Sequence, residues 1–511
     1  MADNKELKKL VDEGKGANLS KEEMEAMLKA SSGELTAEQQ AIIEEFDREQ
    51  KVRKFDGLMQ KFYYWAAVLI GLWHLYCCAF GGPVTLVYRS MHVAFMVALG
   101  FLLYPVTRSK KHFKEGVPWY DWLLIILSMA VPVYMAVNYI EVVNHAGNPT
   151  TVDTIMATIL LVTLLEATRR VSGLPLIILS GLFLLYGIFG RMMPVFRHRG
   201  YMWDQLINHL FANTEGIYGT SVDVSVTYIF LFIMFGAVMN KSGMGQFFND
   251  IALALAGASR GGPAKVSVCA SAFLGSINGS AVANVVTTGA FTIPLMKKTG
   301  YSKEFSGAVE SAASVGGQLL PPIMGAAAFI MAEMLSVKYT EIIVWAAIPA
   351  LLYYLGIIIQ VQLRASKDGL VGLPKDQLPK AGAVMKRQGH LMIPVLFLLY
   401  MLFFSGTTVI FSAVCTIIVT VVVSQISAST RMGVKDFIEA LADGAKQTVS
   451  VAVACACVGI IIGVSSKTGF GLTLANTIIS LGSQSILFTL IFFALLFFIV
   501  VSIILGIIPL A

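Results

Sequence analysis

Polar residues interrupt an apolar stretch of the chain at Gly275–Gly289, where the sequence is GSINGSAVANVVTTG. The backbone carbonyls, hydroxyl groups and amide oxygens of residues 276–280 are ligands that suit a hard cation such as sodium. Helix N-termini formed beside such a stretch favour an anion. The alternative is a packing face of small residues, as at Gly-x-x-x-Gly helix contacts. A packing face does not explain why an amide and hydroxyls cluster at one point, so the pattern favours a binding site.

A second irregular segment follows at 311–335, with the sequence SAASVGGQLLPPIMGAAAFIMAEML. Adjacent glycines at 316–317 and adjacent prolines at 321–322 lie inside a segment that is otherwise apolar enough to span a membrane. Because proline removes helix hydrogen bonds and clashes with the preceding turn, we expect a broken helix at 304–335. Carbonyls freed between the glycines and the prolines, together with the Gln318 amide, would complete a site opposite the polar tip. A simple proline kink is the alternative.

The composition is that of a membrane protein. Of the 511 residues, 56% are hydrophobic and 14% are charged, and the mean hydropathy is +0.71. Apolar segments of spanning length follow one another from Phe62 to Leu505. The six cysteines form no C-x-x-C pair and lie in apolar surroundings, so neither a disulfide framework nor a zinc site is indicated. We therefore expect an all-α polytopic membrane protein.

The positions of Lys and Arg predict how the chain is oriented. Basic residues from Lys51 to Lys61 precede the first span, which places the N-terminus in the cytoplasm. The stretch 266–296 has basic residues at both ends, Arg260 and Lys265 before it and a Lys pair at 297–298 after it. It is too short for two crossings of roughly 20 residues each, so we expect a re-entrant hairpin whose two ends lie on the same side.

A short pattern occurs twice, as KSGMG at 241–245 and as KTGFG at 467–471. An odd number of predicted crossings separates the copies, so the second is expected to be an inverted repeat of the first, as in many secondary transporters. The segment NKSG resembles the end of a P-loop, but Phe235 and Asn240 replace the glycines that the loop requires. No nucleotide site is indicated, and the basic loop at 364–389 is interpreted as a linker rather than as a nucleic-acid-binding patch.

Together these motifs resemble a known family, the fused membrane subunits of tripartite ATP-independent periplasmic (TRAP) transporters that partner TAXI-type binding proteins. The resemblance depends on GSINGSAVANVVTTGAFTIPLMKKTGY, on VESAASVGGQLLPPIMGAAAFIMAEML and on the Lys-Ser-Gly pattern, and it covers about residues 200–505. It implies an elevator-type secondary transporter of the bacterial inner membrane, not an enzyme. Such a transporter takes up an organic anion, here a carboxylate-bearing metabolite, with Na+ as the coupling ion. A periplasmic TAXI-type substrate-binding protein would be its partner.

The resemblance also assigns site residues. It places sodium ligands at Ser276, Asn278, Gly279, Ser280 and Gly316. It places substrate-binding residues at Asn278, Ser280, Asn284, Gln318 and Pro321. No catalytic residue is expected.

The expected domain organisation combines the spans with the resemblance. It consists of a cytoplasmic polar helical extension at 1–56, a four-helix scaffold resembling the fused small subunit at 57–172, a connecting helix and interfacial arm at 173–224, a first repeat at 225–363 with the hairpin and the broken helix, the cytoplasmic linker at 364–389, and a second inverted repeat at 390–511.

In the family the second repeat continues with a Gly-rich stretch and a second polar tip, whereas this sequence finishes with SIILGIIPLA. The second repeat is therefore expected to be incomplete.

Other classes of membrane protein stay open as alternatives. A sodium/carboxylate symporter could use the same hairpin without a binding protein. An ion channel could use the polar tip but would more naturally show a symmetric pore motif. An intramembrane protease could use Ser280 as a nucleophile, but no His or paired Asp lies in the hairpin stretch 266–296 to activate it.

A few ionisable residues fall in or near the predicted spans. Arg89 and Glu166 are expected to snorkel to the helix ends. His74 is expected to be a helix-packing residue. Glu310 precedes the predicted helix break, and two roles are open for it, support of the break or proximity to the bound cation.

Overall fold

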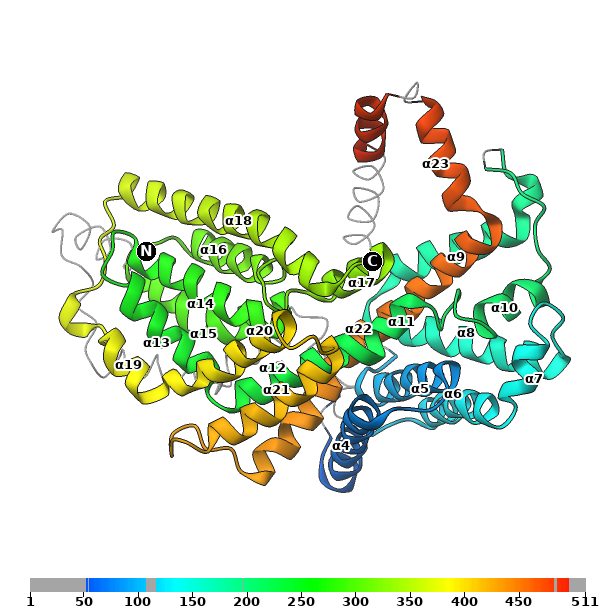
Figure 1. Cartoon of the computed structure of the whole chain (residues 1–511), viewed down its shortest axis with the longest axis horizontal. Helices are drawn as coiled ribbons and strands as arrows, with labels where there is room; N and C mark the ends of the chain where they lie inside the picture. Colours follow the sequence, from blue (N-terminus) through cyan, green and yellow to red (C-terminus); the bar gives the residue numbers. More distant parts are fainter. Residues whose placement is uncertain (1–51, 54, 107–115, 195, 482–484, 496–511) are drawn as a thin grey trace. The chain divides into compact units, whose positions relative to one another are not determined.

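The computed structural model describes residues 52–53, 55–106, 116–194, 196–481 and 485–495 (Figure 1). Most of the expected polar extension at 1–56, and residues 496–511 of the expected second repeat, lie outside this described part. Within it every regular element is a helix and none is a strand, which confirms the all-α prediction. Eight helical runs of the described part are long and apolar enough to cross a membrane. The chain is therefore a polytopic membrane protein.

The helices follow one another in chain order with short connections. They are α4 (Gly57–Phe80), α5 (Thr85–Leu103), α6 (Trp119–Val137), α7 (Tyr139–Asn144), α8 (Thr151–Val171), α9 (Leu174–Phe189), α10 (Trp203–Phe211), α11 (Thr220–Val224), α12 (Phe230–Lys241), α13 (Met244–Ala256), α14 (Gly262–Asn278), α15 (Ala281–Lys298), α16 (Lys303–Gly316), α17 (Ala326–Leu335), α18 (Tyr339–Lys367), α19 (Ala381–Gln388), α20 (Met392–Phe403), α21 (Val409–Ser424), α22 (Val434–Thr468) and α23 (Phe470–Leu481).

Two predicted elements differ from the helices observed. The apolar window at Val449–Val464 lies inside the much longer α22, because the polar residues that precede the window are good helix formers. The predicted interfacial helix at 201–219 is shortened to α10, and Leu206–Phe211 of α10 are buried. Six of the nine residues of α10 thus pack inside the protein, and the position of this helix at a membrane surface stays a prediction.

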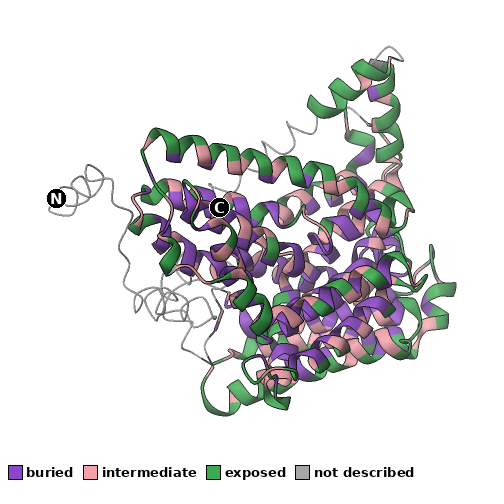
Figure 2. Ribbon diagram, turned by 60° about the vertical axis from the view of Figure 1, so that its left-hand side comes forward, coloured by how far each residue is buried: buried purple, intermediate pink, exposed green. Residues whose placement is uncertain are grey.

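The described residues form two compact units. One unit spans Tyr228–Ala445 and contains α12 to α21 with the start of α22. In this unit α14, α15 and α16 all pack against one another, and α13 packs against α14. Buried apolar residues of α14, α15, α16 and α18, among them Val268, Met296 and Tyr354, form its core. By contrast α18 is mostly exposed along its length (Figure 2).

The other unit combines the described helices before Thr227 with the part of α22 after Lys446 and with α23. Here α5 is the most enclosed of the first helices and packs against α6 and α8. The helix α8 begins with a capping box, in which Thr150 and Asp153 satisfy each other's backbone N–H groups.

The repeated sequence pattern has the same local backbone in both copies. Gly243 follows α12 and precedes α13 with φ +88°, and Gly469 follows α22 and precedes α23 with φ +68°. Both glycines adopt the left-handed conformation that ends one helix and redirects the chain into the next. This agreement supports a duplicated unit, and the inversion of the second copy stays a prediction.

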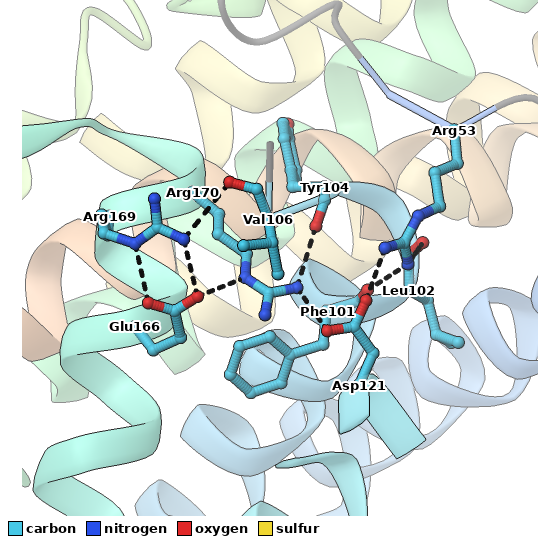
Figure 3. Close-up of polar contacts among 9 residues, drawn as sticks. All are labelled: Arg53, Phe101, Leu102, Tyr104, Val106, Asp121, Glu166, Arg169 and Arg170. Carbon is cyan, nitrogen blue, oxygen red and sulfur yellow. Dashed lines mark hydrogen bonds and ion pairs between the residues drawn. The ribbon is translucent and has the colours of Figure 1, made fainter. Parts of the chain in front are cut away.

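Two buried arginines, Arg53 and Arg170, form ion pairs with the Asp121 carboxylate (Figure 3). The cluster lies at the C-termini of α5 and α8 and at the N-terminus of α6. Asp121, in the first turn of α6, accepts from Arg53 and, at 2.7 Å, from Arg170 of α8. Arg53 also donates to the carbonyls of Phe101 and Leu102, which α5 leaves unpaired at its C-terminus. One ion cluster thus joins three helix ends and the segment before α4.

We expect Asp121→Asn to destabilise the protein by about 3–5 kcal/mol, because both arginines keep their buried charges and lose the carboxylate. The side chains of Arg53 and Arg170 are only 2% and 1% exposed, so water cannot replace the lost partner. The measurement is the thermal midpoint of the purified protein in detergent. Asp376→Asn, an exposed aspartate, is the matched control. Equal midpoints for the two variants would contradict the assignment.

A second acid, Asp250 of α13, makes stability depend on pH. Asp250 is 7% exposed, and one carboxylate oxygen lies 3.7 Å from the Arg387 guanidinium of α19. Burial raises the pKa of Asp250 to about 6, although Arg387 lowers it in part. Between about pH 4 and pH 6 the unfolded acid loses its proton while the folded acid keeps it, so stability falls as pH rises through this window.

We expect Asp250→Asn to remove this loss. The variant should be more stable than the wild type above about pH 6, by at most about 3 kcal/mol, and the advantage should disappear near about pH 4. Thermal midpoints of the two proteins, measured at several pH values, check this. A constant difference at all pH values would show that the Asp250 carboxyl does not titrate as described.

Candidate functional site

The polar stretch at 276–280 joins two helices in a tight turn. α14 ends at Asn278, and the Gly279 N–H donates to the Gly275 carbonyl at 3.1 Å. Gly279 has φ +63°, a conformation that disfavours any residue with a Cβ. Ser280 then caps α15, because its hydroxyl accepts the Ala283 N–H at 3.3 Å. A helical hairpin thus forms at the predicted residues, and its entry and exit on one side of the membrane stay a prediction.

The predicted helix break is also present. α16 ends at Gly316, α17 begins at Ala326, and the connecting residues include a cis peptide bond between Pro321 and Pro322. Tight turns replace the helix here, and the Gln318 carbonyl accepts the Gly325 N–H at 2.8 Å. The segment is therefore an unwound connection and not a simple proline kink.

The hairpin tip and the helix break contact each other through their backbones. The Ile323 N–H donates to the Ser276 carbonyl at 3.1 Å. A Cβ added to Gly279 would lie 2.4 Å from the Met324 carbonyl oxygen, which is closer than real Cβ contacts.

A pair of glycines makes a similarly close contact one turn earlier in α14. A Cβ on Gly275 would lie 2.7 Å from the Gly317 Cα, and a Cβ on Gly317 would lie 2.6 Å from the Gly275 Cα. We call the set Gly275, Ser276, Gly279, Gly317, Ile323 and Met324 the tip–break contact. Only the absence of side chains at its three glycines permits it.

The predicted site residues of the hairpin lie at this contact. The Ser276 hydroxyl donates to the Phe273 carbonyl at 2.8 Å, so its side chain serves its own helix. Asn278 accepts the Ser280 N–H at 3.2 Å through Oδ1, while its Nδ2 is buried without a partner. Asn284, one turn into α15, donates to the Ser271 carbonyl at 2.7 Å, and its Oδ1 is buried without a partner. The tip thus offers one unused donor and one unused acceptor.

The predicted residues of the break fall in different environments. Gln318 is exposed and Pro321 is half-buried. Gly316 packs against α18, where an added Cβ would lie 2.5 Å from a ring carbon of Tyr353. The neighbouring Gly317, not Gly316, touches the hairpin, so the predicted role of Gly316 as a ligand opposite the tip lacks this support.

The chemistry of the tip fits a small hard cation and an anion. Its oxygen atoms come from an amide, a hydroxyl and backbone carbonyls, and the unpaired Asn284 Oδ1 is an acceptor of the kind a cation would satisfy. The unpaired Asn278 Nδ2 and the first N–H groups of α15 are donors suited to an anion. Within the described residues no group of three His, Cys, Asp or Glu side chains could hold a metal, so a transition-metal site is not indicated there.

One buried acid behind the tip is more central than the sequence analysis predicted. Glu310 of α16 is fully buried, and its carboxylate is surrounded by hydroxyl groups of α14, α15 and α16. The signal was visible as Ser and Thr at helical spacing, 267 with 271 and 288 with 292. The sequence does not show that the Ser face of α14 and the Thr face of α15 both contact Glu310, because this depends on how the helices pack.

One prediction about a charged residue near a helix end is wrong. Arg89 does not snorkel to the membrane surface, because its guanidinium is buried, lies 2.8 Å from Asp223 and donates to the Tyr218 carbonyl at 2.7 Å. Glu166 pairs with Arg169 and Arg170 near the end of α8, and its snorkelling stays a prediction. His74, expected to pack between helices, is buried and lies 2.7 Å from the His92 ring nitrogen.

A helical hairpin that meets a broken helix inside a polytopic membrane protein is typical of one class, the membrane permeases of secondary transport. Comparison with known families agrees: residues 159–511 match the family described as the tripartite ATP-independent periplasmic transporter, DctM component. The chain belongs to this family.

Relatives with assigned names match shorter segments. The isethionate TRAP transporter permease of Oleidesulfovibrio alaskensis is 30% identical over 35% of this chain and 28% of its own length. The C4-dicarboxylate TRAP large permease of Vibrio cholerae is 33% identical over 28% of this chain and 31% of its own length. The sialic acid TRAP permease of Haemophilus influenzae is 27% identical over 28% of this chain and 23% of its own length. The chain thus spans less than a third of each of these relatives.

We expect Gly279→Ala to destabilise the protein, by about 1–2 kcal/mol from backbone strain alone and by more if the Met324 carbonyl must move. Gly307→Ala is the matched control, because Gly307 lies inside α16 and an added Cβ meets nothing within 4 Å. That control should be neutral or stabilising by about 0.5–1 kcal/mol. Thermal midpoints in detergent measure both, and a harmless Gly279→Ala would contradict the close contact with the break.

Proposed function

We propose that the protein takes up an organic anion by sodium-coupled secondary transport, with the substrate beside the tip–break contact. The observation that carries the proposal is the pair of unused polar atoms next to this contact, Asn278 Nδ2 and Asn284 Oδ1. Buried polar atoms without partners are costly, and a ligand that pairs with them removes the cost. A transporter is not an enzyme, and no covalent chemistry is assigned to these residues.

Sodium is the proposed coupling ion. Its ligands would be oxygen atoms of Ser276, Asn278, Gly279 and Ser280 at the tip, with Gly316 of the break as the least supported member. An oxygen-only set with an amide, hydroxyls and carbonyls suits a hard monovalent cation. When bound, the ion would supply positive charge that an anionic substrate next to it requires.

The proposed substrate is a carboxylate-bearing metabolite. Asn278, Ser280 and Asn284 of the hairpin and Gln318 and Pro321 of the break would contact it. α15 begins directly after Ser280, so its N-terminus lies at the hairpin tip. The positive end of a helix favours a carboxylate. The relatives are named for isethionate, C4-dicarboxylates and sialic acid. All three are organic anions, of which the last two carry carboxylates and isethionate carries a sulfonate.

The proposed partner is a periplasmic substrate-binding protein of the TAXI type that delivers the anion. The family description, a tripartite periplasmic transporter, supports a binding protein as one of three components. The protein would lie in the bacterial inner membrane with its N-terminus in the cytoplasm, where basic residues precede the first span. The hairpin-bearing unit would carry the substrate by an elevator movement.

We expect sodium-driven uptake in liposomes to depend on the tip. Labelled organic acids would be supplied with candidate binding proteins, with and without an inward sodium gradient. Asn278→Ala and Ser280→Ala should each lower uptake about tenfold or more, which corresponds to about 1.4 kcal/mol of lost interaction. Ser429→Ala, an exposed serine of the same unit outside the site, should leave uptake unchanged.

Three other outcomes distinguish the alternatives. Sodium-driven uptake without any binding protein would identify a symporter that works alone. Sodium-independent single-channel current would identify a channel. Uptake that ignores both sodium and the tip substitutions would overturn the proposed mechanism.

A further inference from the structure

The Glu310 carboxylate lies in a cage of hydroxyl groups between three helices. The hydroxyls of Ser267 and Ser271 on α14 donate to it at 2.6 Å and 2.9 Å, and Ser314 on α16 donates at 3.2 Å. Thr288 and Thr292 on α15 donate to Oε1 and Oε2 respectively. We call these five side chains the hydroxyl cage.

No positive charge balances Glu310 within the described residues. It is 0% exposed and makes no ion pair there, and every hydrogen bond that it forms there is to a Ser or Thr hydroxyl. An ionised carboxylate in such an environment costs several kcal/mol unless hydrogen bonds or a cation compensate it.

The surrounding helices offer few titratable groups. On α18, Tyr354 interacts electrostatically with Glu310 and with Cys269 of α14, and its hydroxyl donates to the Ala313 carbonyl at 2.8 Å. The lysines of the packed helices lie in their first or last turns, at Lys265 of α14, Lys297 and Lys298 of α15 and Lys303 of α16, and the exposed Glu304 follows Lys303. The basic residues of α18, Arg364 and Lys367, also lie in its last turn. The hydroxyl cage is therefore the polar environment that surrounds the Glu310 carboxylate among the described residues.

A metal cation does not fit between the carboxylate and the cage. The hydroxyl oxygens already lie at direct hydrogen-bond distances from both carboxylate oxygens, 2.6–3.2 Å for the serines. A cation placed between them would have to replace these contacts. A proton adds no volume, so it is the cation that this cage can accept.

The hydroxyl cage can satisfy both charge states of Glu310. A carboxylate has about four acceptor positions, and five hydroxyl donors lie around it. When Glu310 takes up a proton, its new O–H needs an acceptor. Thr288 can provide one, because its hydroxyl can turn its own proton to the Asn284 carbonyl, which lies at 2.8 Å.

The same hydroxyls connect Glu310 to the hairpin tip. The carbonyl that Thr288 would use belongs to Asn284, whose own N–H donates to the Ser280 carbonyl at 3.0 Å. Ser271 contacts Thr288 at 2.9 Å through its hydroxyl, and its carbonyl accepts the Asn284 side chain at 2.7 Å. A proton on Glu310 thus changes the hydrogen bonds of a residue that lies at the proposed substrate site.

We infer that Glu310 is a proton-binding site that is loaded and unloaded during transport, so that a proton accompanies the anion and the sodium ion. The proton binds a carboxylate oxygen from water on one side of the membrane and returns to water on the other, and no other bond changes. This inference rests on the proposed function for its role in transport. The titration of Glu310 itself can be tested without transport.

The first experiment is infrared titration of the full chain in lipid nanodiscs. We expect a carbonyl stretching band of a protonated carboxyl that appears as pH falls, is lost in Glu310→Gln and is kept in the matched control Glu304→Gln, an exposed acid of the same helix. Thr288→Val should shift the pH at which the band appears, because it removes the hydroxyl that adapts to the proton. A band that never appears, or one that is present at every pH, would overturn the inference.

Transport supplies the second test. In liposomes with an inward pH gradient and equal sodium on both sides, wild-type protein and Glu304→Gln should accumulate substrate, whereas Glu310→Gln should not. Glu310→Gln should still exchange internal for external substrate, which shows that it is folded and binds. Proton-driven accumulation that survives Glu310→Gln would overturn the inference. If no variant transports, the infrared titration still decides the proton site, and the proposed function alone is overturned.

Discussion

The structure of the hairpin-bearing unit depends on one constraint, that backbone groups released by a broken helix must find partners away from water. The hairpin tip and the break between α16 and α17 solve this for each other, since Ile323 donates to Ser276 across the contact. The glycines at 275 and 317 allow the two backbones to meet. Because each irregular segment completes the other, neither is expected to keep its shape alone.

The hydroxyl cage extends this arrangement into the interior of α14, α15 and α16. The same helices that end at the tip–break contact supply the five side chains around Glu310. The proposed ligand site at the tip and the buried carboxyl in the core therefore belong to one packed group of helices. A rearrangement at either end must be accommodated at the other.

Much of this unit could be predicted from the sequence because its signals are local. Glycine, proline, serine and asparagine act against helix wherever they fall, so the turn at Gly279 and the break after Gly316 were both located. Contacts that depend on helix rotation could not be predicted. One residue along a helix turns the face by about 100°, which is why Gly317 and not Gly316 meets the hairpin. The ion pair between Arg89 and Asp223 could not be predicted either, because the two residues lie far apart in the sequence.

The glycine pair at 275 and 317 has a consequence for how such permeases can diversify. A contact made only of backbone offers no side chain for mutation to adjust, so its geometry is fixed while residues around it remain free to vary. The exposed Gln318 lies immediately beside this fixed point. Under the proposed function, new substrate preferences can therefore evolve at Gln318 and its exposed neighbours without altering the contact that holds the hairpin and the broken helix together.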